Sequence, residues 1–157
     1  MRSSALVDGA IAGAVGTTAL NVVGYLDILV RARPPSSAPA ASARRMAELA
    51  RLDLGPEERA VNRHEGLGAL LGYATGVAAG VAFAMLVKRR MPLTAATGLL
   101  GGGAMAMSDV AITALGVSDP RTWTRTDWLS DIVPHLAYGV AAAATWNRLR
   151  PPSGRGR

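Results

Sequence analysis

The residues of this chain that could carry proton or ligand chemistry are a few acids and two histidines, set among long apolar stretches. Asp109 interrupts one such stretch. Asp131 and His135 stand four residues apart, so a helix would place them on one face. Ionisable side chains inside apolar segments are costly and mark a function unless they are paired. Because an imidazole titrates near neutral pH, this group predicts binding of a proton or of a small polar solute.

Further polar residues stand near the ends of apolar stretches that should meet in the same half of a membrane. The full set predicted to line a polar vestibule is Asn21, Tyr25, Asp27, His64, Glu65, Asp109, Asp131, His135 and Tyr138. Asp109 and His135 are expected at its centre, modulated by Asp27 and Asp131. Pro134 should bend its helix and free a backbone carbonyl, which needs a polar neighbour inside a membrane.

Other interpretations of these residues stay open. Asp109 and His135 could instead form a structural bridge that fixes the helices. Asp131 and His135 have a spacing that suits two metal ligands, but two histidines in the whole chain argue against a closed site, and we expect no metal and no cofactor. An enzyme acting on a lipid headgroup could use the same residues. Since the sequence holds no nucleophilic triad, phosphate loop or dinucleotide motif, we expect no enzymatic activity.

Composition places these residues in a membrane protein. Of 157 residues, 50% are hydrophobic and 18% are charged, whereas soluble domains average about 25% charged residues. The net charge is +6 while the mean hydropathy is +0.23. This pairing argues against a soluble nucleic-acid-binding protein, which would carry its basic residues on one polar face. The lack of cysteine excludes disulfides and cysteine-based zinc sites.

Apolar stretches long enough to cross a bilayer predict an all-α fold, an integral membrane bundle of four transmembrane helices in a single domain of residues 1–150. The spans are expected at about residues 5–30, 65–88, 92–115 and 127–148. The fourth is the weakest and reaches spanning length only if its helix begins near Thr126. Trp128 and Trp146 would then anchor its two ends at the membrane interfaces.

A polar loop of residues 31–64 joins the first two spans and is predicted to be partly helical. Ser42 is the expected N-cap of a short helix that stops by Gly55, and Pro56 should start a helix that continues into the second span. The short helix is either a solvated connector or a helix on the membrane surface. Residues 151–157 are predicted to be disordered.

With four spans, both termini and the turn at Lys88, Arg89 and Arg90 share one side of the membrane. Basic residues are nearly balanced between the two sides. Their concentration in this tight turn favours the cytoplasm for this side. We therefore predict cytoplasmic termini and a vestibule that faces outward.

Glycines recur at every fourth position of the second span, as Gly68, Gly72, Gly76 and Gly80. Residues four apart share a helix face, so this row predicts a smooth groove for close helix packing. The groove should pack the bundle internally. Alternatively, it packs against a second copy or a membrane partner, in which case the chain is a structural or accessory subunit and the polar cluster only locks its fold.

The order of motifs resembles the YagU-like family of small bacterial inner-membrane proteins. The motifs that carry the likeness are Ile11-Ala12-Gly13, Asp27 ahead of Pro34-Pro35-Ser36-Ser37, Gly98-Leu99-Leu100 with Gly102, Leu115-Gly116 with Pro120 and Trp123, Ser130-Asp131 with His135-Leu136, and Asn147-Arg148-Leu149-Arg150. The chain departs from the family pattern around Asn21–Gly24. The resemblance implies a location in the bacterial inner membrane and a part in acid tolerance, and it brings no catalytic residues with it.

Overall fold

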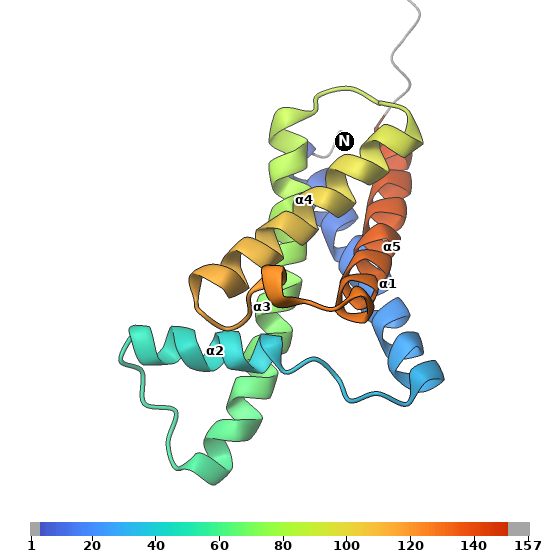
Figure 1. Cartoon of the computed structure of the whole chain (residues 1–157). Helices are drawn as coiled ribbons and strands as arrows, with labels where there is room; N and C mark the ends of the chain where they lie inside the picture. The colour runs from blue at the N-terminus through green and yellow to red at the C-terminus, as the bar shows by residue number, and fades with distance from the viewer. Residues whose placement is uncertain (1–3, 151–157) are drawn as a thin grey trace, which may run out of the picture.

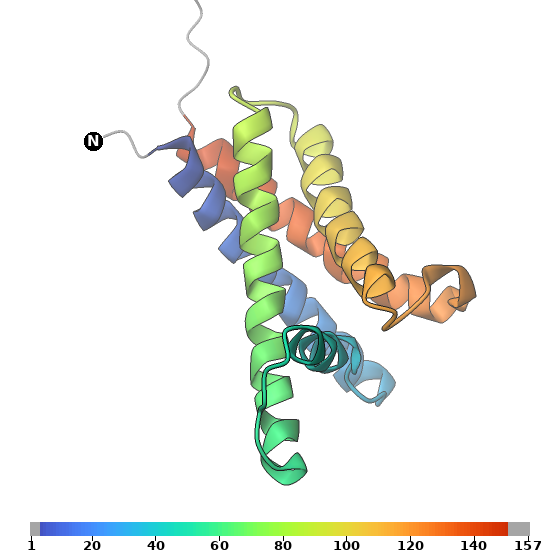
Figure 2. The same cartoon turned by 90° about the vertical axis from the view of Figure 1, so that its left-hand side faces the viewer.

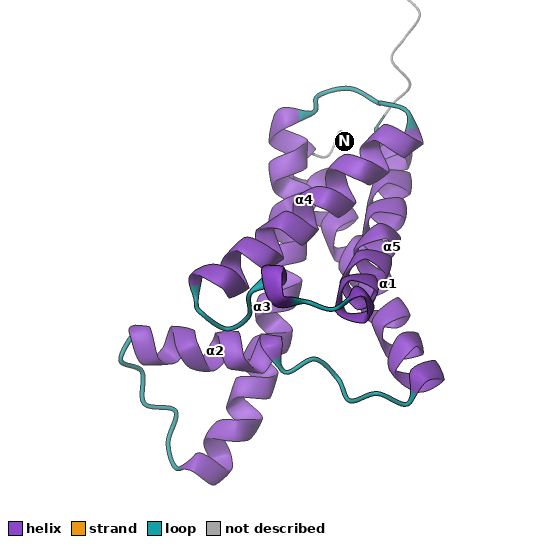
Figure 3. Cartoon of the chain, in the orientation of Figure 1, coloured by secondary structure: helices purple, strands orange, loops and turns teal. Residues whose placement is uncertain are grey.

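The computed structural model describes residues 4–150, which are helical almost throughout (Figures 1 and 3). Its elements are α1 (Ala5–Arg31), α2 (Ala38–Leu49), α3 (Glu57–Leu86), α4 (Leu93–Ala114), the short 3-10 helix η1 (Pro120–Thr122) and α5 (Arg125–Leu149). Within these residues no strand is present, so the predicted all-α class is confirmed. The disorder predicted for residues 151–157 concerns a segment outside the described residues.

Three helices are long and apolar enough to cross a membrane, namely α1, α3 and α4. The predicted membrane character is thereby supported for three spans and not for all four. The helix expected as the fourth span, α5, has 25 residues but does not meet the same standard of apolarity. Its sequence carries Asp127, Asp131 and His135, which lower its average hydropathy.

α1 and α5 lie side by side, and the long helices α3 and α4 pack against them (Figure 2). α1 packs against both α3 and α5, whereas α4 packs mainly against α5 and has fewer contacts with α3. The core between them is built largely from alanines together with Phe83, Leu100, Tyr138 and Trp146. Small residues allow the helix backbones to approach closely, which is how helices gain contact where water does not drive them together.

The glycine row of α3 is not one continuous groove. Gly80 packs against α1, where an added Cβ would lie 2.8 Å from the Cα of Gly13. Gly76 faces Thr17 of α1 and the ring of Tyr138. Gly68 meets the backbone of Pro39 and Ala40 in α2 instead, and no atom lies within 4 Å of a Cβ added to Gly72. The expectation of a single packing face therefore holds for only part of the row, because α2 covers one end and Gly72 is exposed.

The loop helix begins earlier than predicted. α2 starts at Ala38 after Ser37, which places Ser42 inside the helix rather than at its N-cap. Pro39 occupies the first turn, where its missing N–H costs no hydrogen bond. α2 lies across α3 and buries Ala43 and Ala47 (Figure 1).

The starts of the two other helices can be compared with their predicted positions. α3 begins directly after Pro56 and continues into the span, as predicted. The N-cap of α5 is Thr124, two residues before the predicted Thr126. The side chain of Thr124 accepts a hydrogen bond from Asp127 N, and the Asp127 side chain accepts one from Thr124 N. This reciprocal pair satisfies two backbone donors that a helix start leaves free.

Candidate functional site

The best-defined polar contact inside the bundle joins Asp131 and His135 on α5. Nδ1 of His135 lies 3.1 Å from Oδ1 of Asp131 and 2.9 Å from the Asp131 carbonyl oxygen. His135 is buried, with 8% of its surface exposed. α5 continues without interruption past Pro134, so the one-turn spacing read from the sequence does place these two side chains together.

Asp109 reaches this pair from α4 because the two helices are in backbone contact nearby. A Cβ added to Gly101 would lie 2.7 Å from the carbonyl oxygen of His135. Two turns further along α4, the carboxylate of Asp109 is within electrostatic range of Asp131 and His135. No hydrogen bond or ion pair joins Asp109 to His135 among the described residues, and Asp131 engages only Nδ1 of the imidazole.

Two carboxylate oxygens of this cluster are buried and unused. Oδ1 of Asp109 and Oδ2 of Asp131 have no hydrogen-bond partner among the described residues. Leaving a buried acceptor unsatisfied costs about 1–3 kcal/mol, so such a site favours a proton or another donor. A shallow hollow of about 400 Å³ adjoins it, lined by Asp109, Val110, Thr113, Ala114 and Pro120. The hollow borders the Asp109 side chain.

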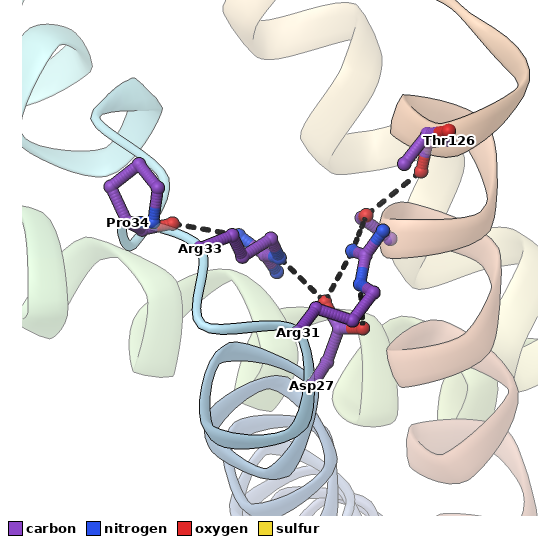
Figure 4. A network of polar contacts seen from close by, with 6 residues as sticks. Asp27, Arg31, Arg33, Pro34 and Thr126 are labelled. Atoms are coloured by element: carbon purple, nitrogen blue, oxygen red, sulfur yellow. Dashed lines mark hydrogen bonds and ion pairs between the residues drawn. The ribbon is translucent and has the colours of Figure 1, made fainter.

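Asp27, predicted to modulate the vestibule, belongs to a separate ion-pair network (Figure 4). Its carboxylate accepts hydrogen bonds from Nε of Arg31 and Nε of Arg33, each at 2.6 Å. Arg31 also donates to Oγ of Ser130, which in turn donates to the Thr126 carbonyl at 2.8 Å. The network therefore fastens the last turn of α1 to the start of α5.

The other predicted vestibule residues are dispersed. Tyr25 is 68% exposed, and Asn21 is half-buried on the same helix. His64 and Glu65 lie on α3, half-buried and exposed respectively. Tyr138 is fully buried and donates its hydroxyl to the Gly76 carbonyl at 2.6 Å. Of the nine candidates, the structure thus groups Asp109, Asp131 and His135, and it gives Tyr138 a packing contact instead.

A second polar group, at the opposite end of the bundle, was not predicted from the sequence. Asp8 is buried, and its Oδ2 lies 3.8 Å from Nε of Arg150. The guanidinium of Arg150 lies 4.4 Å from the ring centre of Trp146, whose edge-to-face neighbour is Phe83. Trp146 and Arg150 are one turn apart, but Asp8 and Phe83 are far from them in the chain, so only the three-dimensional packing reveals the group.

Neither group presents an obvious metal site. Over residues 4–150, no three or more His, Cys, Asp and Glu side chains are placed to hold a metal ion. No protein-family model, curated protein or solved structure matches this chain. What the fold defines is therefore a class, an all-α protein with candidate membrane-spanning helices. Its function has to be argued from the geometry above.

Proposed function

We propose that this chain is a non-enzymatic, four-span protein of the bacterial inner membrane, with both termini in the cytoplasm, that binds a proton or a small polar solute at Asp109, Asp131 and His135. The basic residues concentrated in the turn between α3 and α4 favour a site that faces outward. The resemblance to YagU-like proteins favours a part in acid tolerance. The observation that carries the proposal is the buried Asp131–His135 contact with an unsatisfied acid from α4 beside it.

The direction of the side chains of α5 supports its role as the fourth span. Its 25 residues extend about 37 Å, more than a hydrocarbon core of about 30 Å. Asp131 and His135 face inward, since their side chains are only 19% and 10% exposed. Between Asp127 and Arg148, which are exposed near the two ends of the helix, the exposed large side chains are apolar, namely Leu129, Ile132, Val133, Leu136 and Val140. A helix with this distribution can face lipid although its average hydropathy is low.

The chemistry of the cluster suits uptake of a small positive species. Two carboxylates that lie close together repel one another, and a low-dielectric surrounding strengthens that repulsion. A proton, or a small solute carrying a positive donor, relieves it and satisfies the unused oxygens of Asp109 and Asp131. Imidazole is the side chain suited to exchange that proton near neutral pH.

Histidine NMR tests proton binding directly, because the chain contains only two histidines. The protein is labelled with ¹⁵N-histidine and placed in lipid nanodiscs. The substitution His64→Gln removes the other histidine, so His135 gives the only histidine signal. We expect His135 to titrate, and Asp109→Asn to shift its midpoint. The matched control Asp53→Asn, in the loop before α3, should leave the midpoint unchanged. A His135 signal that does not respond to pH, or one that Asp109→Asn leaves unaltered, rejects the proposal.

The acid-tolerance part of the proposal needs a cellular measurement. Cells that depend on this chain should lose survival after an acid challenge when they carry Asp109→Asn, at an unchanged protein level in the membrane. Cells with Asp53→Asn should survive like the wild type. Equal survival of cells carrying the two variants would contradict the role in acid tolerance. The NMR titration would still decide separately whether the site binds a proton.

A second candidate function is that of a structural or accessory membrane subunit. It is favoured by Gly98 and Gly102, which stand one turn apart on α4 with no atom within 4 Å of an added Cβ at either position. Close helix docking uses such small faces. Gly102→Leu should dissociate an oligomer, or release a partner, only if this face is a contact. Gly72→Leu tests in the same way whether the exposed position on α3 is a contact with an oligomer or a partner.

A further inference from the structure

Two basic segments that are far apart in the sequence come together at the end of the bundle opposite the Asp/His site. Nε of Arg90, in the turn between α3 and α4, donates to the carbonyl oxygen of Arg150 at 2.7 Å. Nδ2 of Asn147 donates to the Met91 carbonyl at 3.2 Å. These bonds join the turn to the end of α5. The resulting group, here called the basic collar, consists of Lys88, Arg89, Arg90, Arg148 and Arg150.

Arg150 is held in place within the collar. Its guanidinium lies 4.4 Å from the centre of the Trp146 ring, and its Nε lies 3.8 Å from Oδ2 of Asp8. One acid thus offsets part of the charge of five basic side chains. Nη2 of Arg150 and Nε1 of the fully buried Trp146 have no hydrogen-bond acceptor among the described residues. Arg150 is therefore a fixed, largely buried charge behind the exposed side chains of Lys88, Arg89, Arg90 and Arg148.

Exposed apolar side chains adjoin the collar. Leu86 at the end of α3 is 84% exposed, Leu93 at the start of α4 is 49% exposed, and Leu149 at the end of α5 is 40% exposed. Three helices thus present leucine next to arginine or lysine at one end of the bundle. A free inorganic anion would use only the charges, whereas a ligand with a charged head and long apolar chains would use both.

We propose that the basic collar binds the headgroup of an anionic phospholipid, whose acyl chains lie along Leu86, Leu93 and Leu149. Arginine suits this ligand because its planar fork can donate two parallel hydrogen bonds to a phosphate. Clusters of basic residues beside membrane-spanning helices also attract the anionic leaflet. The inference is independent of the Asp/His site and does not require that site to function.

The test compares two variants that lose the same charge. The first replaces Lys88, Arg89 and Arg90 of the collar with Gln. The control replaces Arg51, Arg59 and Arg125 with Gln, which are exposed basic residues elsewhere in the chain. Purified full-length proteins in detergent receive phosphatidylglycerol, phosphatidylcholine or inorganic phosphate, and bound ligand is counted by native mass spectrometry. Arg90→Gln alone is measured in parallel, so that a poorly folded triple variant does not decide the result.

The wild type should retain phosphatidylglycerol over phosphatidylcholine by about tenfold or more, given the attraction of each basic residue for an anionic surface. The collar variant should lose most of this preference, Arg90→Gln part of it, and the control variant none. The proposal is overturned if the wild type shows no preference, or if the control variant loses as much as the collar variant. Inorganic phosphate that displaces the lipid at equal concentration would also overturn it, because the acyl chains would then contribute nothing.

Discussion

Tyr138 of α5 donates its hydroxyl to the backbone carbonyl of Gly76 of α3 at 2.6 Å, with its side chain fully buried. The ring also lies against Gly16, where an added Cβ would come within 2.7 Å of it. Three helices therefore meet at one side chain. The glycines on α1 and α3 leave the space that the ring occupies, so the residue types at these positions depend on one another.

Tyr138→Phe should destabilise the fold while keeping its shape. The substitution removes the hydroxyl and its bond to Gly76 but leaves the ring in place, so we expect a loss of about 0.5–1.5 kcal/mol of unfolding free energy. Denaturant unfolding in detergent micelles measures it. Tyr25→Phe removes the same atom from a side chain that is 68% exposed and should change nothing. Equal effects of the two substitutions would contradict the packing role.

Gly80→Ala and Gly72→Ala make the same chemical change on one helix and should give opposite results. A methyl group at Gly80 meets the α1 backbone at Gly13, which cannot rotate away, so we expect a loss of about 1–3 kcal/mol or failure to accumulate in the membrane. At Gly72 it meets no neighbour, and the better helix propensity of alanine should be neutral or stabilising by up to about 1 kcal/mol. Expression level and detergent unfolding decide between these outcomes.

Asp27→Asn should weaken the contact between α1 and α5 without altering the Asp/His site. The substitution removes the charge that holds Arg31 and Arg33, and through Arg31 the contact to Ser130. Since these side chains are partly exposed, we expect only a small loss of stability. The NMR titration of His135 should match the wild type. A shifted midpoint would instead make Asp27 part of the proton site.

The loop between α4 and α5 should respond to acid through Asp119. The Arg121 guanidinium and backbone N–H hold the pKa of this carboxyl below its ordinary value of 3.8. A lowered pKa in the fold means that the contact stabilises the loop fully above pH 3.8 and is lost as the pH falls through the lower folded value. Trp123 reports the change by fluorescence, since its Nε1 bonds to Ser118 in the same loop. Asp119→Asn should reduce the acid response, whereas Asp53→Asn should keep it in full.

Apolar length and helix periodicity were sufficient to predict the coarse architecture. The start of α3 at Pro56 followed from local helix rules, and the Asp131–His135 contact followed from its one-turn spacing. Thr124 as the N-cap of α5 was also accessible, because Asp127 stands three residues later in the spacing of a capping box. Thr126 is an equally acceptable N-cap by local rules, because Asp127 would then stand in the first turn of the helix.

The partners of the remaining polar residues depended on how the helices rotate and cross. Asp27 has Arg31 one turn away, but the contact from Arg31 to Ser130 exists only because α1 lies on α5. The Asp8–Arg150 contact joins the two ends of the described chain. The role of each glycine depended on the neighbour, since Gly68 meets α2 and Gly72 meets none. Spacing along one helix cannot supply that information.

The length of α3 has a consequence for where the chain meets water. Its 30 residues extend about 45 Å, whereas the oily interior of a bilayer is about 30 Å thick. Whatever the direction of insertion, several turns must project beyond the lipid, and the charged first turns from Glu57 to Glu65 are the part that tolerates this. A chemical label on the first turns of α3 would report which compartment these turns enter. One accessible position on α3 would thereby reveal on which side of the membrane the segments that flank this helix lie.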